Sequence, residues 1–318
     1  MARGACGGGP SGAPPEWAVD AVLAVAPGTC FCCCAVGGKT GFPGFFPLPG
    51  SHLASLQFSM VRLAANLTFL FREVPFLERF SAAARCGFRA VEFLFPYEHD
   101  AAVLGAELRR NGLQQALFNA PAGDWDGGER GLGGVPGREA DFREGVHRAL
   151  EYAAELHCPL VHVMAGTRAQ GAEEGIFVER LRWAADLAAA AEVRLCIEPL
   201  NARDVPGYIV PDTRTAMELL HQIDRPNCSL QLDLYHLQVT EGDLSTRIRA
   251  LLPSVSHVQI ANPPGRHEPG EGEVHFPPLF DLLDSLGYEG FVGCEYHPRH
   301  GSTRESLSWA SGLLHADA

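Results

Sequence analysis

The feature that most limits how this chain can fold is an alternation of short apolar segments and amphipathic segments that begins at Met60. The apolar segments are rich in branched residues and predict strands, whereas the segments between them have helical periodicity. Strands are expected at Val61–Asn66, Ala90–Phe95, Gln114–Asn119, Leu160–Ala165, Val193–Glu198, Ser229–Tyr235, Ser256–Ala261 and Gly290–Glu295. Helices are expected at Phe76–Cys86, Ala101–Asn111, Arg138–Leu156, Phe177–Ala191, Thr213–Ile223, Ser245–Leu251 and Pro278–Leu286.

Eight such strands in residues 60–318 predict a single (β/α)₈ TIM barrel, a fold that typically takes about 250 residues. An open doubly wound sheet is the alternative, and it would need a glycine turn for phosphate after the first strand. The segment Leu67–Phe71 follows that strand and contains no glycine, which favours the barrel. In a barrel, the chemistry is expected at the carboxyl ends of the strands.

Residues 1–59 differ in composition from the rest of the chain. They hold clusters of glycine and proline and the cysteine-rich run Cys30–Cys34. Glycine and proline at such close spacing prevent long helices or strands. Adjacent cysteines lack the spaced pattern of a zinc site. We expect residues 1–59 to be a disordered or irregular extension outside the fold, and residues 60–318 to be the TIM-barrel domain, which starts at Met60.

Composition excludes several classes of function. The formal net charge of −13 argues against nucleic acid, and no segment approaches the roughly 20 apolar residues that span a membrane. The only lysine is Lys39, which argues against Schiff-base and pyridoxal-phosphate chemistry. Single cysteines in apolar contexts predict reduced thiols and therefore a cytoplasmic protein. These cysteines are Cys86, Cys158, Cys196, Cys228 and Cys294. A homo-oligomer is compatible with the sequence, which does not specify one.

Oxygen-bearing side chains interrupt the last four predicted strands at matching depth. Carboxylates occur in three of these strands and an amide in the other. They are Glu198, Asp233, Gln259 and Glu295. A carboxylate inside a parallel strand is costly unless a cation or hydrogen bonds compensate it, and a lone one is often paired with arginine. Four on consecutive strands instead predict a shared site for a hard divalent ion, Mg²⁺ or Mn²⁺.

Other polar residues near the predicted strand ends carry weaker signals. His236 and Asn119 are candidate substrate contacts, and Arg266, in a long glycine-rich loop, is the candidate anchor for a substrate carboxylate. Glu92 either faces the site or caps a loop. His162 is interpreted as a core histidine, and nothing supports a role for the two remaining strand-associated histidines, His257 and His297.

Several motifs resemble those of the hydroxypyruvate isomerase family, in the xylose-isomerase-like barrel superfamily. They are Ala65-Asn66-Leu67, Gly87–Glu92, Pro121-Ala122-Gly123-Asp124, Ile197–Asn201, Gln231–His236, His257–Ala261 and Gly293–Tyr296, and the resemblance covers nearly all of residues 60–310. It implies that Glu198, Asp233, Gln259 and Glu295 hold a divalent ion. It also implies that Glu198 and Glu295 donate and accept the proton. Related ketose epimerases have a histidine where this chain has Gln259.

The resemblance implies an enzyme that interconverts hydroxypyruvate and 2-hydroxy-3-oxopropanoate (tartronate semialdehyde). Metal-assisted proton transfer through an enediolate would perform this reaction on a small anionic keto acid. Three alternatives stay open. They are an epimerase or isomerase of another small sugar or sugar acid, an apurinic-site endonuclease, which would need more histidines for its zinc ions, and a barrel without catalytic activity.

Overall fold

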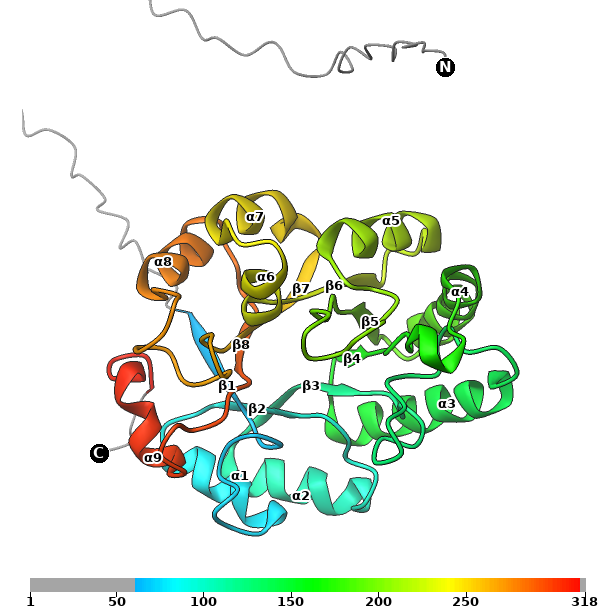
Figure 1. Ribbon diagram of the computed structural model, residues 1–318. Coiled ribbons are helices and arrows are strands. Elements are labelled where there is room, and N and C mark those ends of the chain that lie inside the picture. Colours follow the sequence, from blue (N-terminus) through cyan, green and yellow to red (C-terminus); the bar gives the residue numbers. More distant parts are fainter. Residues whose placement is uncertain (1–60, 315–318) are drawn as a thin grey trace, which may run out of the picture. The chain divides into compact units, whose positions relative to one another are not determined.

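The structure is a computed structural model that describes residues 61–314, and within this range the strands close into a parallel barrel in sequence order (Figure 1). The strands are β1 (Arg62–Asn66), β2 (Ala90–Phe93), β3 (Gln114–Asn119), β4 (Leu160–His162), β5 (Arg194–Ile197), β6 (Cys228–Asp233), β7 (Val255–Ile260) and β8 (Phe291–Cys294). The predicted fold class is confirmed. The predicted extension, residues 1–59, and Met60 lie outside the described residues.

Helices surround the barrel and connect its strands (Figure 1). They are α1 (Phe76–Arg85), α2 (Ala101–Asn111), α3 (Glu139–Leu156), α4 (Glu174–Ala190), α5 (Thr213–Ile223), α6 (Leu234–Thr240), α7 (Leu244–Leu251), α8 (Pro277–Ser285) and α9 (Thr303–Ser306). Short 3₁₀ helices occupy Arg168–Gln170, Leu252–Ser254 and Leu307–Ala310. Between residues 61 and 314, no helix combines the length and the apolar character needed to cross a bilayer.

The main core is apolar and lies against the strands. Phe80 of α1 packs edge to face with Phe93 of β2, with 6.1 Å between ring centroids, and both side chains are almost fully buried. Such burial of large side chains between helices and parallel strands explains why the strand segments are nearly continuous apolar runs. The polar residues inside the strands are therefore surrounded by buried apolar side chains.

The predicted strand Ser229–Tyr235 is too long, because β6 ends at Asp233 and α6 begins immediately afterwards. The Asp233 carboxylate accepts a hydrogen bond of 2.8 Å from the backbone N–H of Tyr235 and so caps the helix. Because apolar residues continue on both sides of Asp233, the sequence pattern did not indicate this boundary, and α6 was not predicted. The correction places His236 on the first turn of a helix instead of just past the end of a strand.

Candidate active site

The four predicted metal ligands lie at the carboxyl ends of four consecutive strands, a region that we call the barrel mouth. Asp233 ends β6 and pairs in register with Gln259 of β7, while Glu198 and Glu295 directly follow β5 and β8. Each of the four is at most 8% exposed. The closed barrel thus brings three carboxyl groups and one amide together, although they are far apart in the sequence.

Arg266 extends from the loop after β7 into the barrel mouth and contacts two of these carboxyl groups. Its Nη2 lies 3.3 Å from Asp233 Oδ2 and also donates to Glu295 Oε1. Its guanidinium carbon lies 5.2 Å from the ring centroid of Phe69 and 5.1 Å from that of Tyr235, which adds cation–π attraction. One arginine is therefore shared by two carboxylates, so the simple pairing of each carboxylate with its own arginine does not describe this site.

Glu198 forms no ion pair with an arginine among the described residues. Its Oε1 is buried without a hydrogen-bond partner there, and its Oε2 lies 3.7 Å from His162 Nδ1. Burial lowers the pKa of His162 to about 3, so this ring is neutral. Burial also raises the pKa of Glu198 well above its usual range, and the charges of Glu295 and Asp233 add to this effect.

The barrel mouth fits a divalent cation. Glu198 and Asp233 each offer a carboxylate oxygen within 4.8 Å of the other and of a His236 ring nitrogen, and Glu198 Oε1 is buried without a hydrogen-bond partner in residues 61–314. Burial raises the pKa of Asp233, and it raises the pKa of Glu295 to about 8, although the charge of Arg266 lowers both. A cation would relieve this cost, and carboxylate oxygens suit Mg²⁺ or Mn²⁺.

The Gln259 amide is held by hydrogen bonds at both of its ends. Its Nε2 donates to Glu92 Oε1 at 2.8 Å and to Glu295 Oε2 at 2.6 Å, and its Oε1 accepts from Gln231 Nε2 at 2.6 Å. The nitrogen, not the oxygen, therefore faces the carboxylates in this network. The role of Gln259 as a metal ligand stays a prediction.

His236 presents one ring nitrogen to the barrel mouth. Its Nδ1 accepts a hydrogen bond of 3.1 Å from the backbone N–H of Asn201, so the ring proton is on Nε2, which lies 3.7 Å from Asp233 Oδ2. Burial, together with the charge of Arg266, holds the pKa of His236 well below its usual value. The ring is consequently neutral and offers an N–H donor at the site.

Asn119, the other predicted substrate contact, lies at the end of β3 and is 4% exposed. Its Oδ1 is 3.3 Å from His162 Nδ1, and this histidine lies between Asn119 and Glu198. The predicted core position of His162 is thus correct, but the residue also reaches the candidate site. Direct substrate contact by Asn119 stays a prediction.

Comparisons with known proteins agree with the barrel fold. The family model described as xylose isomerase-like TIM barrel matches residues 80–313. The 2-oxo-tetronate isomerase of Cupriavidus necator is 49% identical over 259 residues, which are 80% of this chain and 99% of that protein. The hydroxypyruvate isomerase of Escherichia coli is 42% identical over 254 residues, with 79% and 98% covered. The chain belongs to the xylose isomerase-like TIM barrel family. Its relatives place it among the small sugar-acid isomerases, so it is an enzyme of the isomerase class.

Solved structures give the same family fold. A crystal structure described as an AP endonuclease, family 2, from Brucella melitensis is 48% identical, has a TM-score of 0.78, and covers 80% of this chain and 100% of that one. A D-psicose 3-epimerase from Clostridium cellulolyticum has a TM-score of 0.63 at 18% identity, with 80% and 100% covered, and shares the fold.

The isomerase also contains a buried polar layer below the mouth that the sequence did not reveal. Glu92 is fully buried and accepts hydrogen bonds from His257 Nε2 at 2.6 Å and Asn66 Nδ2 at 3.0 Å, as well as the bond from Gln259. Asn66 also donates to Glu295 Oε2 at 2.9 Å. Glu92 thus faces the barrel interior and holds two of the donors that orient Glu295.

Position 293 in β8 makes room for this layer. A Cβ atom on Gly293 would lie 2.3 Å from Glu92 Oε2, so a side chain there would collide with the carboxylate. Gly293 pairs in register with Gln259. In the sequence, a glycine inside this strand was the one indication that another side chain, here that of Glu92, approaches the strand closely. It could be recognised only after the register of the barrel was known.

Proposed function

We propose that the chain interconverts hydroxypyruvate and 2-hydroxy-3-oxopropanoate, and that 2-oxo-tetronate is the second candidate substrate. The observation that carries the proposal is a pair of buried glutamates, Glu198 and Glu295. They enter one site from the ends of β5 and β8, and the surroundings of the two carboxyl groups differ. The second candidate is favoured by the relative at 49% identity, which is named for it. Both substrates are small anionic keto acids.

The two reactions have the same chemistry. In hydroxypyruvate, one proton leaves C3 and one is added at C2, while the hydroxyl proton moves between the two oxygens. In 2-oxo-tetronate, C3 carries an additional hydroxymethyl group, and the same transfer produces the 3-keto isomer. Both pass through an enediolate. A divalent ion held by Glu198, Asp233, Gln259 and Glu295 would polarise the carbonyl and neutralise the enediolate charge.

The two glutamates supply an acid and a base. Glu295 is ion-paired with Arg266 and hydrogen-bonded by Gln259 and Asn66, whereas Glu198 has no arginine partner in the described part of the chain. Carboxyl groups in such different environments favour different protonation states, which separates the roles of acid and base. One removes the carbon proton, and the other returns a proton to the neighbouring carbon.

The surrounding donors suit the remaining groups of the substrate. The Arg266 guanidinium, already beside Asp233 and Glu295, would exchange these contacts for the substrate carboxylate. The Nε2–H of His236 would donate to a substrate hydroxyl or carbonyl oxygen, and Asn119 would support the substrate from β3 through its polar amide.

The observations favour this isomerase over an endonuclease. Residues 61–314 contain a single cluster of potential metal-binding side chains, Glu198, Asp233 and His236, with one histidine, whereas a site for several zinc ions needs more. The net charge of −13 opposes a nucleic-acid partner. We also propose a cytoplasmic location without membrane attachment, since the cysteines of the described region are free thiols.

A substrate profile of the full chain tests this proposal. Purified protein with Mg²⁺ or Mn²⁺ is assayed with hydroxypyruvate, with 2-oxo-tetronate and with neutral ketoses such as D-psicose. We expect kcat/KM for a keto acid to exceed that for the neutral ketose by at least about 100-fold, because only the acid gains the charge-assisted hydrogen bonds to Arg266. In Arg266→Gln this preference should disappear. Equal losses with both substrate classes would contradict the anchoring role, and no turnover of either acid would contradict the function.

A further inference from the structure

Arg266, the candidate substrate anchor, is the last residue of a tight turn that the chain makes after β7. The residues on either side of this turn, Asn262 and His267, exchange two backbone hydrogen bonds, of 2.7 Å and 3.0 Å, and form a short antiparallel bridge. Arg266 has a φ of 58°, a left-handed conformation that residues other than glycine adopt rarely. The direction in which its side chain leaves the backbone is therefore set by the shape of the turn.

The side chain of Asn262 fixes the turn to the rest of the loop. Asn262 is fully buried, its Oδ1 accepts a hydrogen bond of 2.9 Å from the backbone N–H of Val274, and its Nδ2 donates at 3.0 Å to the carbonyl oxygen of the same residue. Val274 lies at the far end of the long loop between β7 and α8. One side-chain amide thus joins the two ends of the loop that carries Arg266.

A glycine lies where the loop crosses this amide. A Cβ atom on Gly272 would overlap the Cγ, Oδ1 and Nδ2 atoms of Asn262, so a side chain at position 272 would displace the amide. A backbone can approach another group this closely where glycine is present. The path of the loop therefore depends on direct packing of its backbone against the side chain of Asn262.

The turn is also held by the segment that follows β8. The backbone N–H of His297 donates to the carbonyl oxygen of Arg266 at 2.8 Å, and Nδ1 of His267 donates to the carbonyl oxygen of His297 at 2.9 Å. His297 follows Glu295 by two residues, and Glu295 is one of the two carboxyl groups beside the Arg266 guanidinium. A displacement of the turn would therefore move the guanidinium relative to the barrel mouth.

We infer that Asn262 is a positioning residue, which fixes the turn that carries Arg266 and so sets the affinity of the site for a substrate carboxylate. Its side chain binds the backbone of Val274 and acts on the substrate through Arg266. An amide offers both the donor and the acceptor that the peptide groups of Val274 need, whereas a carboxylate offers acceptors alone. The inference rests on the proposed function, because the anchoring of a carboxylate by Arg266 belongs to it.

Binding of D-glycerate tests the role of Asn262 without turnover. This compound has the carboxylate and hydroxyl groups of hydroxypyruvate but no carbonyl group, so it cannot form the enediolate. Isothermal titration calorimetry on the full chain with Mg²⁺ should show saturable binding, with Kd raised about tenfold in Asn262→Asp, because a misplaced Arg266 forms weaker charge-assisted hydrogen bonds. Gly272→Ala, which keeps the amide but displaces it, should raise Kd by a similar factor. With hydroxypyruvate, both variants should raise KM about tenfold and keep kcat within about twofold.

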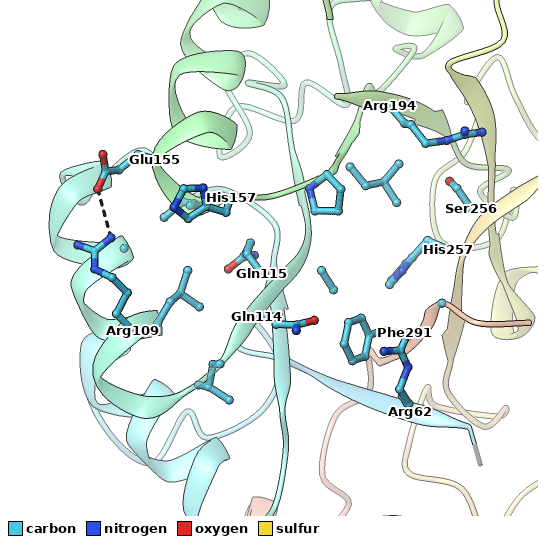
Figure 2. Close-up of a pocket in the computed structure, with 18 of the residues that line it drawn as sticks. Arg62, Arg109, Gln114, Gln115, Glu155, His157, Arg194, Ser256, His257 and Phe291 are labelled. Atoms are coloured by element: carbon cyan, nitrogen blue, oxygen red, sulfur yellow. Dashed lines mark ion pairs between the residues drawn. The ribbon is translucent and has the colours of Figure 1, made fainter. Parts of the chain in front are cut away.

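Two comparisons separate positioning from general destabilisation. In the Arg266→Gln background, Asn262→Asp should cause no further rise in Kd, because the group that it positions is absent. The matched control is Gln115→Glu, at a cavity of about 610 Å³ near the amino ends of the strands (Figure 2). Gln115 is 3% exposed, and its Nε2 donates to the carbonyl oxygen of Leu117 at 2.8 Å. This variant also replaces a buried amide that binds a backbone carbonyl, and it should leave Kd within about twofold.

The outcomes that would overturn the inference concern binding alone. They are a further rise in Kd when Asn262→Asp is added to Arg266→Gln, an equal rise in Gln115→Glu, an unchanged Kd in Asn262→Asp, and absence of D-glycerate binding by the native protein. Native binding without turnover of either keto acid would instead contradict the proposed function, since the calorimetric comparison needs no reaction.

Discussion

The two ends of this barrel carry opposite charge in different surroundings. At the barrel mouth, two of the three buried carboxyl groups share Arg266, and the pKa values of all three are raised because burial disfavours the charged forms. At the amino end, arginines such as Arg109 and Arg194 remain partly in water, where charge costs little. A cation would offset the buried charge of the mouth, whereas the arginines of the amino end are compensated by water.

The largest expected difference between the ends concerns catalysis. Glu198→Gln and Glu295→Gln each replace a proton-transferring carboxyl group by an amide of similar shape, so kcat/KM should fall by at least about 1,000-fold while the fold is kept. Glu155→Gln, in α3 and outside the barrel mouth, is the matched control and should retain activity within about twofold. Steady-state assays with circular dichroism measure both. Near-normal turnover in either mouth variant would exclude the two-carboxyl scheme.

Removal of metal should have the second-largest effect, and it should act on the barrel mouth alone. Exhaustive dialysis against a chelator should reduce turnover by at least about 100-fold, because polarisation of the substrate carbonyl is lost. Addition of Mg²⁺ or Mn²⁺ should restore it and raise the melting temperature, since the ion binds the folded state. Full activity of protein shown to be metal-free would contradict the proposed cofactor.

The buried layer around Glu92 lies between the two ends and should show an intermediate effect. In the native protein, His257, Asn66 and Gln259 donate hydrogen bonds to the two carboxylate oxygens of Glu92. The amide of Glu92→Gln has only one acceptor oxygen, so we expect a loss of about 1–3 kcal/mol in the free energy of unfolding. With Gln259 and Asn66 less constrained, kcat should fall about tenfold with little change in KM. Urea denaturation and steady-state kinetics measure these effects.

Gly293→Ala provides an independent check of this positioning role. Its added methyl group would displace the Glu92 carboxylate without changing any hydrogen-bonding side chain. It should therefore reproduce the loss of kcat seen in Glu92→Gln. A Gly293→Ala enzyme with unchanged kcat would show that Glu92 stabilises the barrel without orienting Glu295.

The sequence predicted the mouth better than it predicted the layer below. Asp233 and Glu295 are carboxylates at the ends of apolar strands, a pattern that is visible without coordinates. Glu92 and His257 come from β2 and β7, which do not neighbour each other in the strand order, so their contact depends on closure of the barrel. The amide orientation of Gln259 was equally inaccessible, because three side chains from other strands determine it.

The smallest expected effect compares two buried glutamines. Gln231, in β6, donates to Gln259 at 2.6 Å and accepts from the Cys196 thiol at 3.3 Å, whereas the Oε1 of Gln115 has no partner among the described residues. Gln231→Met should therefore cost about 1–3 kcal/mol of unfolding free energy. Gln115→Met loses one hydrogen bond but also removes an unsatisfied acceptor, so its cost should be below about 0.5 kcal/mol. Urea denaturation of both variants measures the difference. A large loss in Gln115→Met would mean that its hydrogen bond to the Leu117 carbonyl stabilises the fold.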